Sequence, residues 1–336
     1  MGLFIGNPGS LSSSGGSGHG VGIIDTGIYG VNFASYAGGT NNRVGTRIDD
    51  AAGMNWTRST TTTTGVDDFA GKGPFNVREC VTRWNSSTLK HDIVAYEDED
   101  EWDTYKNNSN LNRMIEFPKF YYNRPSKWQF RVSSEQHDGF LPSPMHYRNG
   151  VMHDYVYIAK YAVDSSFMSR SGQSPKVSTT LEAFRNGIRA NHMYVIDWPV
   201  WCSVAMLMLV KYANLDVQSV VGQGNSSSSA PVTNGAADGV MGKDGGIASA
   251  VGNQGSVVTF GIENWYSNIW YFIDGYFKNG TTMMINEDIA SITANPNTST
   301  WAGYTAMTSQ VPTTTKILKK WKKAEEPKYS AIIVKG

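Results

Sequence analysis

Two acidic residues, Glu263 and Asp274, flank an aromatic stretch in the last third of the chain, GIENWYSNIWYFIDG (261–275). Paired carboxylates beside aromatic rings can cleave glycosidic bonds, so a carbohydrate-active hydrolase is one hypothesis. The alternative is structural, because a carboxylate among aromatic residues needs hydrogen-bond partners, which nearby backbone turns supply. The sequence contains no phosphate-binding glycine loop and no HExxH, CxxC or G-x-S-x-G motif. We favour the structural interpretation and predict that the protein is not an enzyme and has no cofactor.

Two other stretches carry residue types that bind metal ions. The run Glu97–Glu101 (EDEDE) offers the oxygen ligands of calcium, but it lacks the glycine turn and the spaced ligands of an EF-hand loop. His137, His146 and His153 lack the close spacing and the fourth ligand of a zinc site. We therefore expect a solvated acidic run and no metal site.

The two cysteines, Cys80 and Cys202, stand far apart and in no metal-binding spacing. A disulfide between them is one alternative. Because Cys202 falls inside an expected buried helix, we predict two reduced thiols instead.

The composition is low in charge and rich in turn-forming and aromatic residues. Among 336 residues, 29 basic and 29 acidic side chains cancel, so no overall field favours nucleic acid or an anionic membrane. Charged residues are 17% of the chain, below the roughly 25% of ordinary globular proteins. With 35 Gly, 17 Tyr and 10 Trp, the mixture favours short strands, many turns and aromatic surfaces. We expect a protein without nucleic-acid binding or membrane insertion.

The elements that position these residues include one strongly apolar helix, within the stretch 197–224. Asp197 can cap its first N–H groups, and Pro199 falls in the first turn, where a missing N–H costs nothing. Apolar residues cover nearly the whole circumference, which predicts burial on several sides. A membrane span needs about 20 apolar residues, and Lys211 ends this run before that length. We predict a core helix.

A second helix is expected within 178–192, where Thr179 or Thr180 can cap an amphipathic pattern. Strand patterns surround these helices. The expected strands are 114–122 (with Pro118 at an edge or bulge), 127–133, 154–164 and aromatic strands in 257–280.

Three regions follow from the changes in composition. Residues 1–22 are Gly/Ser-rich and predict a flexible arm, which is either a free linker or an arm that orders on docking to a partner. Residues 23–112 predict a β-rich N-terminal region, and residues 113–336 predict a mixed domain. The mixed domain carries a long loop at 222–256 and, in 316–323, a basic patch that we interpret as a solvated helix. The first residues lack the features of a secretory signal, so we expect synthesis in a cytosol.

Several motifs, in this order, resemble a family of phage and prophage tail-associated proteins. They are EFPKFYY (116–122), GF followed by Pro (139–142), YIAKY (157–161), the Asp197–Trp198 helix start, YANLDVQSVVGQG (212–224) and GIENWYSNIWYFIDG (261–275). YGVNF (29–33) and the stretch 67–80 are similar to the N-terminal half of the same family, so the resemblance covers about residues 29–280.

The resemblance implies an α+β protein: a β-rich N-terminal region followed by a C-type-lectin-like domain with two helices, short antiparallel strands and an abbreviated C-terminal end. That fold is shared with formylglycine-generating enzymes, whose late reactive cysteines have no counterpart after Cys202. The resemblance also implies a virion protein made in the host cytoplasm, a homo-oligomer with a trimer favoured, and it makes the arm of residues 1–22 a candidate virion anchor. Its expected partners are other virion proteins and a host cell-surface glycan or protein.

The expected site residues fall into two groups. The candidates for ligand contact are aromatic residues near the end of the domain that we expect to be exposed: Trp265, Tyr266, Trp301 and Tyr304. For Trp265 and Tyr266, a place in the core is an equally good interpretation. The motif residues expected to form the scaffold are Asp197, Trp198, Asn214, Gln218, Gly222, Gly224, Gly261, Glu263, Asn264, Trp270, Asp274 and Gly275.

Three functions are consistent with these patterns. The first is a tail-fibre, tail-tip or head-fibre protein that binds a host receptor through aromatic contacts. The second is an architectural virion protein that uses the same fold only for assembly. The third is the carbohydrate-active hydrolase, for which Glu263 and Asp274 are the only support. We favour the first.

Overall fold

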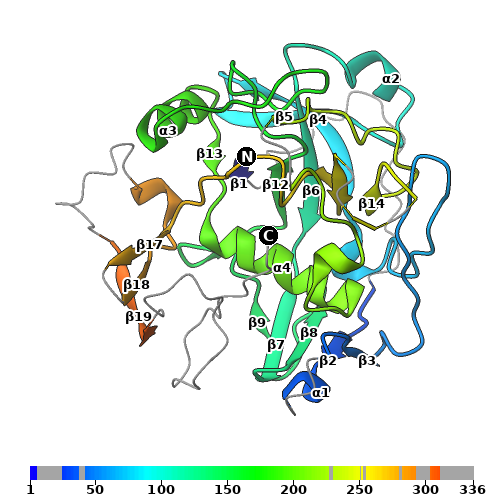
Figure 1. Ribbon diagram of the computed structural model, residues 1–336. Coiled ribbons are helices and arrows are strands. Elements are labelled where there is room, and N and C mark those ends of the chain that lie inside the picture. The colour runs from blue at the N-terminus through cyan, green and yellow to red at the C-terminus, as the bar shows by residue number, and fades with distance from the viewer. Residues whose placement is uncertain are drawn as a thin grey trace.

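The structure is a computed structural model, and it describes residues 1–5, 25–37, 42–226, 230–249, 251–252, 255–279, 282–292 and 303–310. The protein is a strand-rich α+β protein, as its composition and motifs predict. Two larger antiparallel sheets and the helix α4 form its centre (Figure 1). The expected basic patch in 316–323 lies outside the described residues.

The larger sheet has six strands in the order β13-β1-β12-β6-β4-β5, and all neighbours in it are antiparallel. Its strands are β1 (Gly2–Ile5), β4 (Arg78–Asn85), β5 (Lys90–Tyr96), β6 (Asn112–Pro118), β12 (Tyr155–Ala159) and β13 (Tyr194–Val195).

The strand β1 corrects one expectation. Residues 1–22 were expected to form a flexible arm, but Gly2–Ile5 pair with β12 on one side and β13 on the other. The apolar residues that precede the glycine- and serine-rich stretch fill a gap between two strands, where their backbone groups find partners. Residues 6–22 lie outside the described residues.

The second sheet has five strands in the order β3-β2-β8-β7-β9. They are β2 (Tyr29–Asn32), β3 (Thr46–Asp49), β7 (Tyr121–Ser126), β8 (Gln129–Ser133) and β9 (Leu141–Pro142). The single strand expected over 114–122 is wrong, because Pro118 ends β6 and the chain then enters the other sheet as β7. Proline has no N–H to donate to a strand ladder, so it does not fit the middle of an interior strand, and here it stands where β6 ends.

Strand pairing also crosses the boundary expected near residue 112. The strands β2 and β4 precede that boundary, but β4 pairs with β6 and β2 pairs with β8, which begin at or after it. One large hydrophobic cluster likewise includes residues from Met1 to Ile292. The regions 23–112 and 113–336 therefore do not have separate cores.

Both long helices lie where the sequence predicts them. In α3 (Leu181–Ala190) the Thr180 hydroxyl accepts a hydrogen bond from the Ala183 N–H, and in α4 (Trp198–Tyr212) the Asp197 carboxylate accepts one from Val200. Every residue of α4 is buried except Trp201, which is half-buried. The short helices are α1 (Ala34–Ala37), α2 (Trp102–Tyr105) and the 3₁₀ turns Gly73–Phe75, Val217–Ser219 and Ile289–Ser291.

Three small sheets complete the described fold. They are the hairpin of β10 (Tyr147–Arg148) and β11 (Val151–Met152), the sheet of β14 (Gly245–Gly246), β15 (Val257–Thr259) and β16 (Ile262–Glu263), and the sheet of β17 (Tyr276–Asn279), β18 (Thr282–Ile285) and β19 (Thr305–Gln310). The aromatic strands expected over 257–280 are therefore only partly present, because residues 264–275 are irregular.

Lys211, expected at the end of the apolar helix, is buried with 1% of its side chain exposed. Its ammonium group donates to Asp67 and Asp244, each at 2.7 Å. Burial lowers the pKa of Lys211, but the two carboxylates outweigh burial and raise it. This charge group attaches α4 to two loops that are distant in the sequence.

The residues considered for metal binding and for a disulfide have other surroundings. Cys80 and Cys202 are buried free thiols, as predicted. The His146 ring is buried, with Nε2 3.1 Å from the Phe117 carbonyl oxygen. In the acidic run, Glu97 forms an ion pair with Lys243. Within the described residues, no cluster of three or more His, Cys, Asp or Glu side chains is placed to hold a metal ion, and no helix is long and apolar enough to cross a membrane.

We predict that Lys211→Met lowers the free energy of unfolding by about 3–5 kcal/mol, because it leaves the buried Asp244 and the half-buried Asp67 without their cation. Lys119→Met is the matched control, since Lys119 pairs with Asp154 at the surface. That control should cost less than about 1 kcal/mol. Denaturant unfolding measures both, and equal losses in the two variants would contradict this role for Lys211.

Candidate functional site

The start of α4 and the end of the aromatic stretch meet at two adjacent buried aspartates. The Asp274 N–H donates to the Ile196 carbonyl, and the Trp198 N–H donates to the Asp274 carbonyl, both at 2.8 Å. These bonds form a parallel bridge between Asp197 and Asp274, which are at most 1% exposed. Two carboxylates therefore lie in neighbouring positions away from water.

Each aspartate has its own buried arginine. Arg148 donates from both terminal nitrogens to the two oxygens of Asp197, at 2.7 and 2.9 Å. Arg185, from α3, donates from Nε and Nη2 to Asp274 Oδ1, at 2.9 and 2.6 Å. Burial raises the pKa of Asp274, and the bonds from Arg185 oppose that change. These two ion pairs therefore fix the position of Asp274, where the chain that follows residue 263 returns to the core.

Glu263, at the other end of that stretch, is also buried. Its carboxylate accepts hydrogen bonds from the Gly235 N–H at 3.1 Å and from the Ala237 N–H at 2.9 Å. Burial raises its pKa to about 7, although these N–H groups act in the opposite direction. The expected structural role, bonding to backbone turns, is confirmed for Glu263. Asp274 is held by the Arg185 side chain instead.

We call residues 264–274 the aromatic segment. Its first half is anchored in the core: the Trp265 ring stacks on Trp201 with centroids 4.8 Å apart, and the Tyr266 hydroxyl donates to the Gly222 carbonyl at 2.9 Å. In its second half, the Tyr271 hydroxyl donates to the Asn264 carbonyl at 2.9 Å. The segment is thus fastened at both ends and across its middle.

Between these anchors one side chain of the segment is fully exposed to solvent. Ser267 and Asn268 both have positive φ (70° and 64°), which turns the chain outward. Trp270 follows and is fully exposed, with a relative exposure of 101%. The fully exposed indole leaves a large aromatic surface free for contact with a ligand or a partner.

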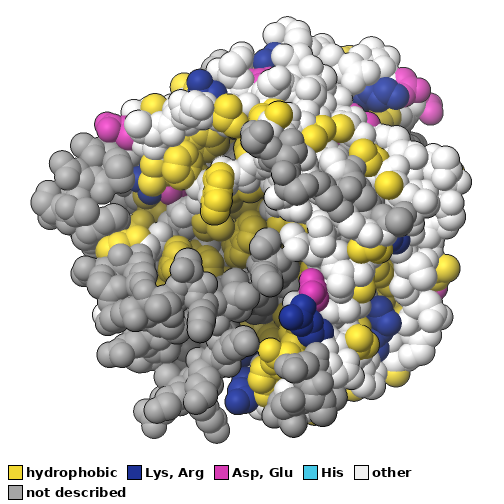
Figure 2. All heavy atoms as spheres, in the orientation of Figure 1, with side chains coloured by type: hydrophobic (Ala, Val, Ile, Leu, Met, Phe, Trp, Pro, Cys, Tyr) yellow, Lys and Arg dark blue, Asp and Glu magenta, His cyan; other side chains and the backbone are white. Residues whose placement is uncertain are grey.

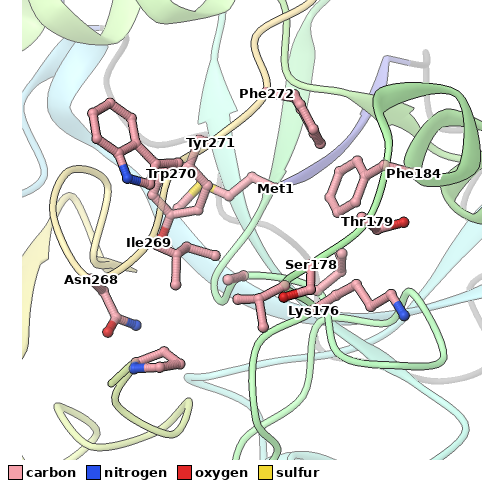
Figure 3. A pocket seen from close by; sticks show the side chains of 14 residues that line it. Met1, Lys176, Ser178, Thr179, Phe184, Asn268, Ile269, Trp270, Tyr271 and Phe272 are labelled. Carbon is pink, nitrogen blue, oxygen red and sulfur yellow. The ribbon is translucent and has the colours of Figure 1, made fainter. Parts of the chain in front are cut away.

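Trp270 stands at the edge of a cleft of about 490 Å³, a size typical of small-molecule sites. We call this the aromatic cleft; its lining comes from residues 268–272, 162–163 and 176–179, with Met1, Phe184 and Pro231. Figure 2 shows hydrophobic side chains gathered around a hollow on this face, below α3. In Figure 3, Trp270, Ile269 and Asn268 lie on one side, Phe184, Thr179 and Lys176 on the other, and Met1 between them.

The polar side chain on the Trp270 side is held by the protein itself. Asn268 Oδ1 accepts from the Val232 N–H at 2.7 Å and from Asn225 Nδ2 at 3.1 Å. The cleft wall therefore joins the aromatic segment to the long loop that begins at residue 222.

The structure corrects the expected ligand contacts. Trp265 and Tyr266 are 1% and 4% exposed, so their expected place on the surface is wrong and the core interpretation is right. Tyr304 is half-buried, with its ring 5.0 Å from that of Phe277, and it does not line the aromatic cleft. Trp301 lies outside the described residues.

Most of the residues expected to form the scaffold are buried. Gly275 shows why glycine is required: its φ is +70°, and a Cβ there would lie 2.5 Å from the Asn286 carbonyl oxygen. Trp270 is the error in this group, because it is exposed, and Gln218 is half-buried. The buried members are Asp197, Trp198, Asn214, Gly222, Gly224, Gly261, Glu263, Asn264, Asp274 and Gly275.

The sequence left Trp265 open between the surface and the core, and it placed the exposed Trp270 in the scaffold. The available signal was the Ser267–Asn268 pair, two turn-forming residues that separate the buried Trp265 and Tyr266 from the exposed Trp270. Nothing in the sequence indicated that residues 176–179 and Phe184 line a cleft, because the fold brings them there from a different part of the chain.

Comparison with models of known protein families and with curated protein sequences finds no match to this chain.

We predict that Glu263→Gln removes a pH dependence of stability. The unfolded carboxyl titrates near 4.5 and the folded one near 7, so between these values the folded protein holds a proton that the unfolded chain has released. The free energy of unfolding of the wild type, relative to the variant, should therefore fall by on the order of 3 kcal/mol as pH rises through this window. Denaturant titrations from pH 4 to 8 measure this, and a difference independent of pH would refute it.

Proposed function

We propose that this chain is a phage virion protein of the tail-fibre, tail-tip or head-fibre type that binds a host-surface receptor. In this proposal the second part of the chain is a C-type-lectin-like domain, and the protein works by binding rather than by catalysis. It acts as a homo-oligomer, with a trimer favoured, on the particle surface beside other virion proteins. The aromatic cleft is its recognition site.

One observation carries the proposal: a fully exposed Trp270 on a segment that is otherwise fastened to the core. Large aromatic side chains dominate binding energies because they bury much area and lose little conformational freedom. A fixed backbone lowers the entropy cost of binding further. The motif resemblance of residues 261–275 supports the same family of receptor-binding proteins.

The positions of Glu263 and Asp274 favour binding over hydrolysis. A carboxyl pKa near 7 is what a catalytic acid would need, yet the Glu263 side chain is 2% exposed and bonded to two backbone N–H groups. Asp274 is equally buried and paired with Arg185. Both side chains already have structural partners.

We predict that Trp270→Ala weakens binding of the purified protein to receptor-bearing bacteria about tenfold or more, because the main apolar contact is lost. Leu89→Ala is the matched control: Leu89 is an apolar residue, 70% exposed, in the turn between β4 and β5. Flow cytometry of labelled protein on a panel of bacterial strains measures both variants.

Binding that is equal in both variants would contradict the role of the cleft. If no strain binds the protein and another virion protein binds it tightly, the architectural alternative is favoured.

A further inference from the structure

The two sides of the aromatic cleft come from distant parts of the chain. Residues 268–270 lie on one side and the stretch 176–179 lies on the other (Figure 3). Residues 162–163 belong to the second side, because the Lys176 N–H donates to the Val163 carbonyl at 2.7 Å. A ligand in the cleft therefore meets two surfaces, and contacts elsewhere in the fold have to set their relative position.

A short piece of the long loop is bonded to the Trp270 side. We call residues 231–235 the bridge segment, and its first residue, Pro231, lines the cleft. The Asn268 side chain meets both backbone groups of Val232: Oδ1 accepts from the N–H at 2.7 Å, and Nδ2 donates to the carbonyl at 3.2 Å. A side-chain amide that uses its donor and its acceptor on one residue holds that residue in a single orientation.

Two residues further on, the bridge segment is bonded to the opposite side. Asn234 donates from Nδ2 to the Ala162 carbonyl at 2.7 Å and to the Arg170 carbonyl at 3.3 Å. Its backbone N–H donates to the Gln173 carbonyl at 3.0 Å, and its carbonyl accepts from the Gly172 N–H at 2.8 Å. Asn234 is 4% exposed, so little water competes for these bonds.

Gly235 shows how closely the bridge segment approaches this second side. Its φ is +86°, and a Cβ there would overlap the Ser171 hydroxyl oxygen. The Gly235 N–H donates to the Glu263 carboxylate at 3.1 Å, just before the aromatic segment begins. The bridge segment is therefore fastened to both sides of the cleft within a few residues.

We infer that Asn234 and Asn268 are positioning residues, which together set the separation of the two sides of the aromatic cleft. This inference rests on the proposed function and concerns the same site. Because Val232 and Asn234 are two residues apart, the loss of either side-chain contact frees one side of the cleft to move relative to the other. Asn234 does not line the cleft, so its effect on a ligand passes through the bridge segment.

Hydrogen exchange resolved to single amides, on the full chain, tests this coupling without a ligand. Asn234→Ala should speed exchange of the Val232 N–H about fivefold or more, although the partner of that N–H, Asn268, is unchanged. In the reverse direction, Asn268→Ala should speed exchange of the Gly172 N–H by a similar factor. Both increases should exceed any change in α4, whose buried amides report global unfolding.

Asn123→Ala is the matched control, because Asn123 donates from Nδ2 to the Gly139 carbonyl at 2.6 Å and lies outside the cleft lining. It should change neither rate. Thermal unfolding checks that each variant is folded, and either of the two positioning variants is sufficient if the other does not fold. An increase at the far bond that is absent, or no larger than in α4, overturns the inference.

Dissociation of labelled protein from receptor-bearing bacteria connects the bridge segment to the proposed function. Asn234→Ala should dissociate about tenfold faster than the wild type, with association little changed, because the cleft is no longer preorganised. Asn234→Asp places a carboxylate against two carbonyl oxygens, and protonation gives that group a donor again. Its binding, relative to the wild type, should therefore recover as the pH falls from 7 to 5.

The outcomes separate the inference from the proposed function. If the wild type binds bacteria and Asn234→Ala dissociates at the same rate, the inference is wrong and the proposed function stands. If the wild type binds no bacteria, the proposed function fails, and the exchange rates at Val232 and Gly172 still decide whether the bridge segment couples the two sides.

Discussion

The site depends on the buried ion pair between Arg185 and Asp274. A similar buried pair, Arg148–Asp197, lies beside it. The first pair joins α3, the first residue of α4 and the end of the aromatic segment at one point. A buried ion pair contributes little net stability compared with apolar packing, because desolvation offsets the attraction. Its value here is geometric, since two-point contacts between a planar guanidinium and a carboxylate hold one orientation.

This anchoring explains how an exposed tryptophan can be well placed. With Glu263 and Asp274 bound at its two ends, the aromatic segment has few backbone conformations left, and Tyr271 closes it on Asn264. A ligand that contacts Trp270 then meets a preformed surface and does not have to order the loop. The same carboxylates that resemble a catalytic pair in the sequence thus serve the binding surface.

Much of the scaffold could be predicted from local patterns. The helix α4, its Asp197 cap and the core role of Glu263 follow from capping chemistry, apolar periodicity and the need of buried charge for partners. The strand β1 and the pairing across residue 112 could not, because pairing between distant strands leaves no local signal. Likewise, Trp265 and Trp270 have similar neighbours in sequence, and only the turn at Ser267–Asn268 and the stacking on Trp201 decide which one is buried.

The central claim is that the cleft beside Trp270 is the surface that meets the receptor. Hydroxyl-radical footprinting, with the protein free and bound to receptor-bearing cells, measures this at single residues. The account predicts strong protection of Trp270 on binding, with the oxidation of Leu89 unchanged. Oxidation of Trp270 at the same rate in both states, with protection elsewhere on the surface, would contradict it.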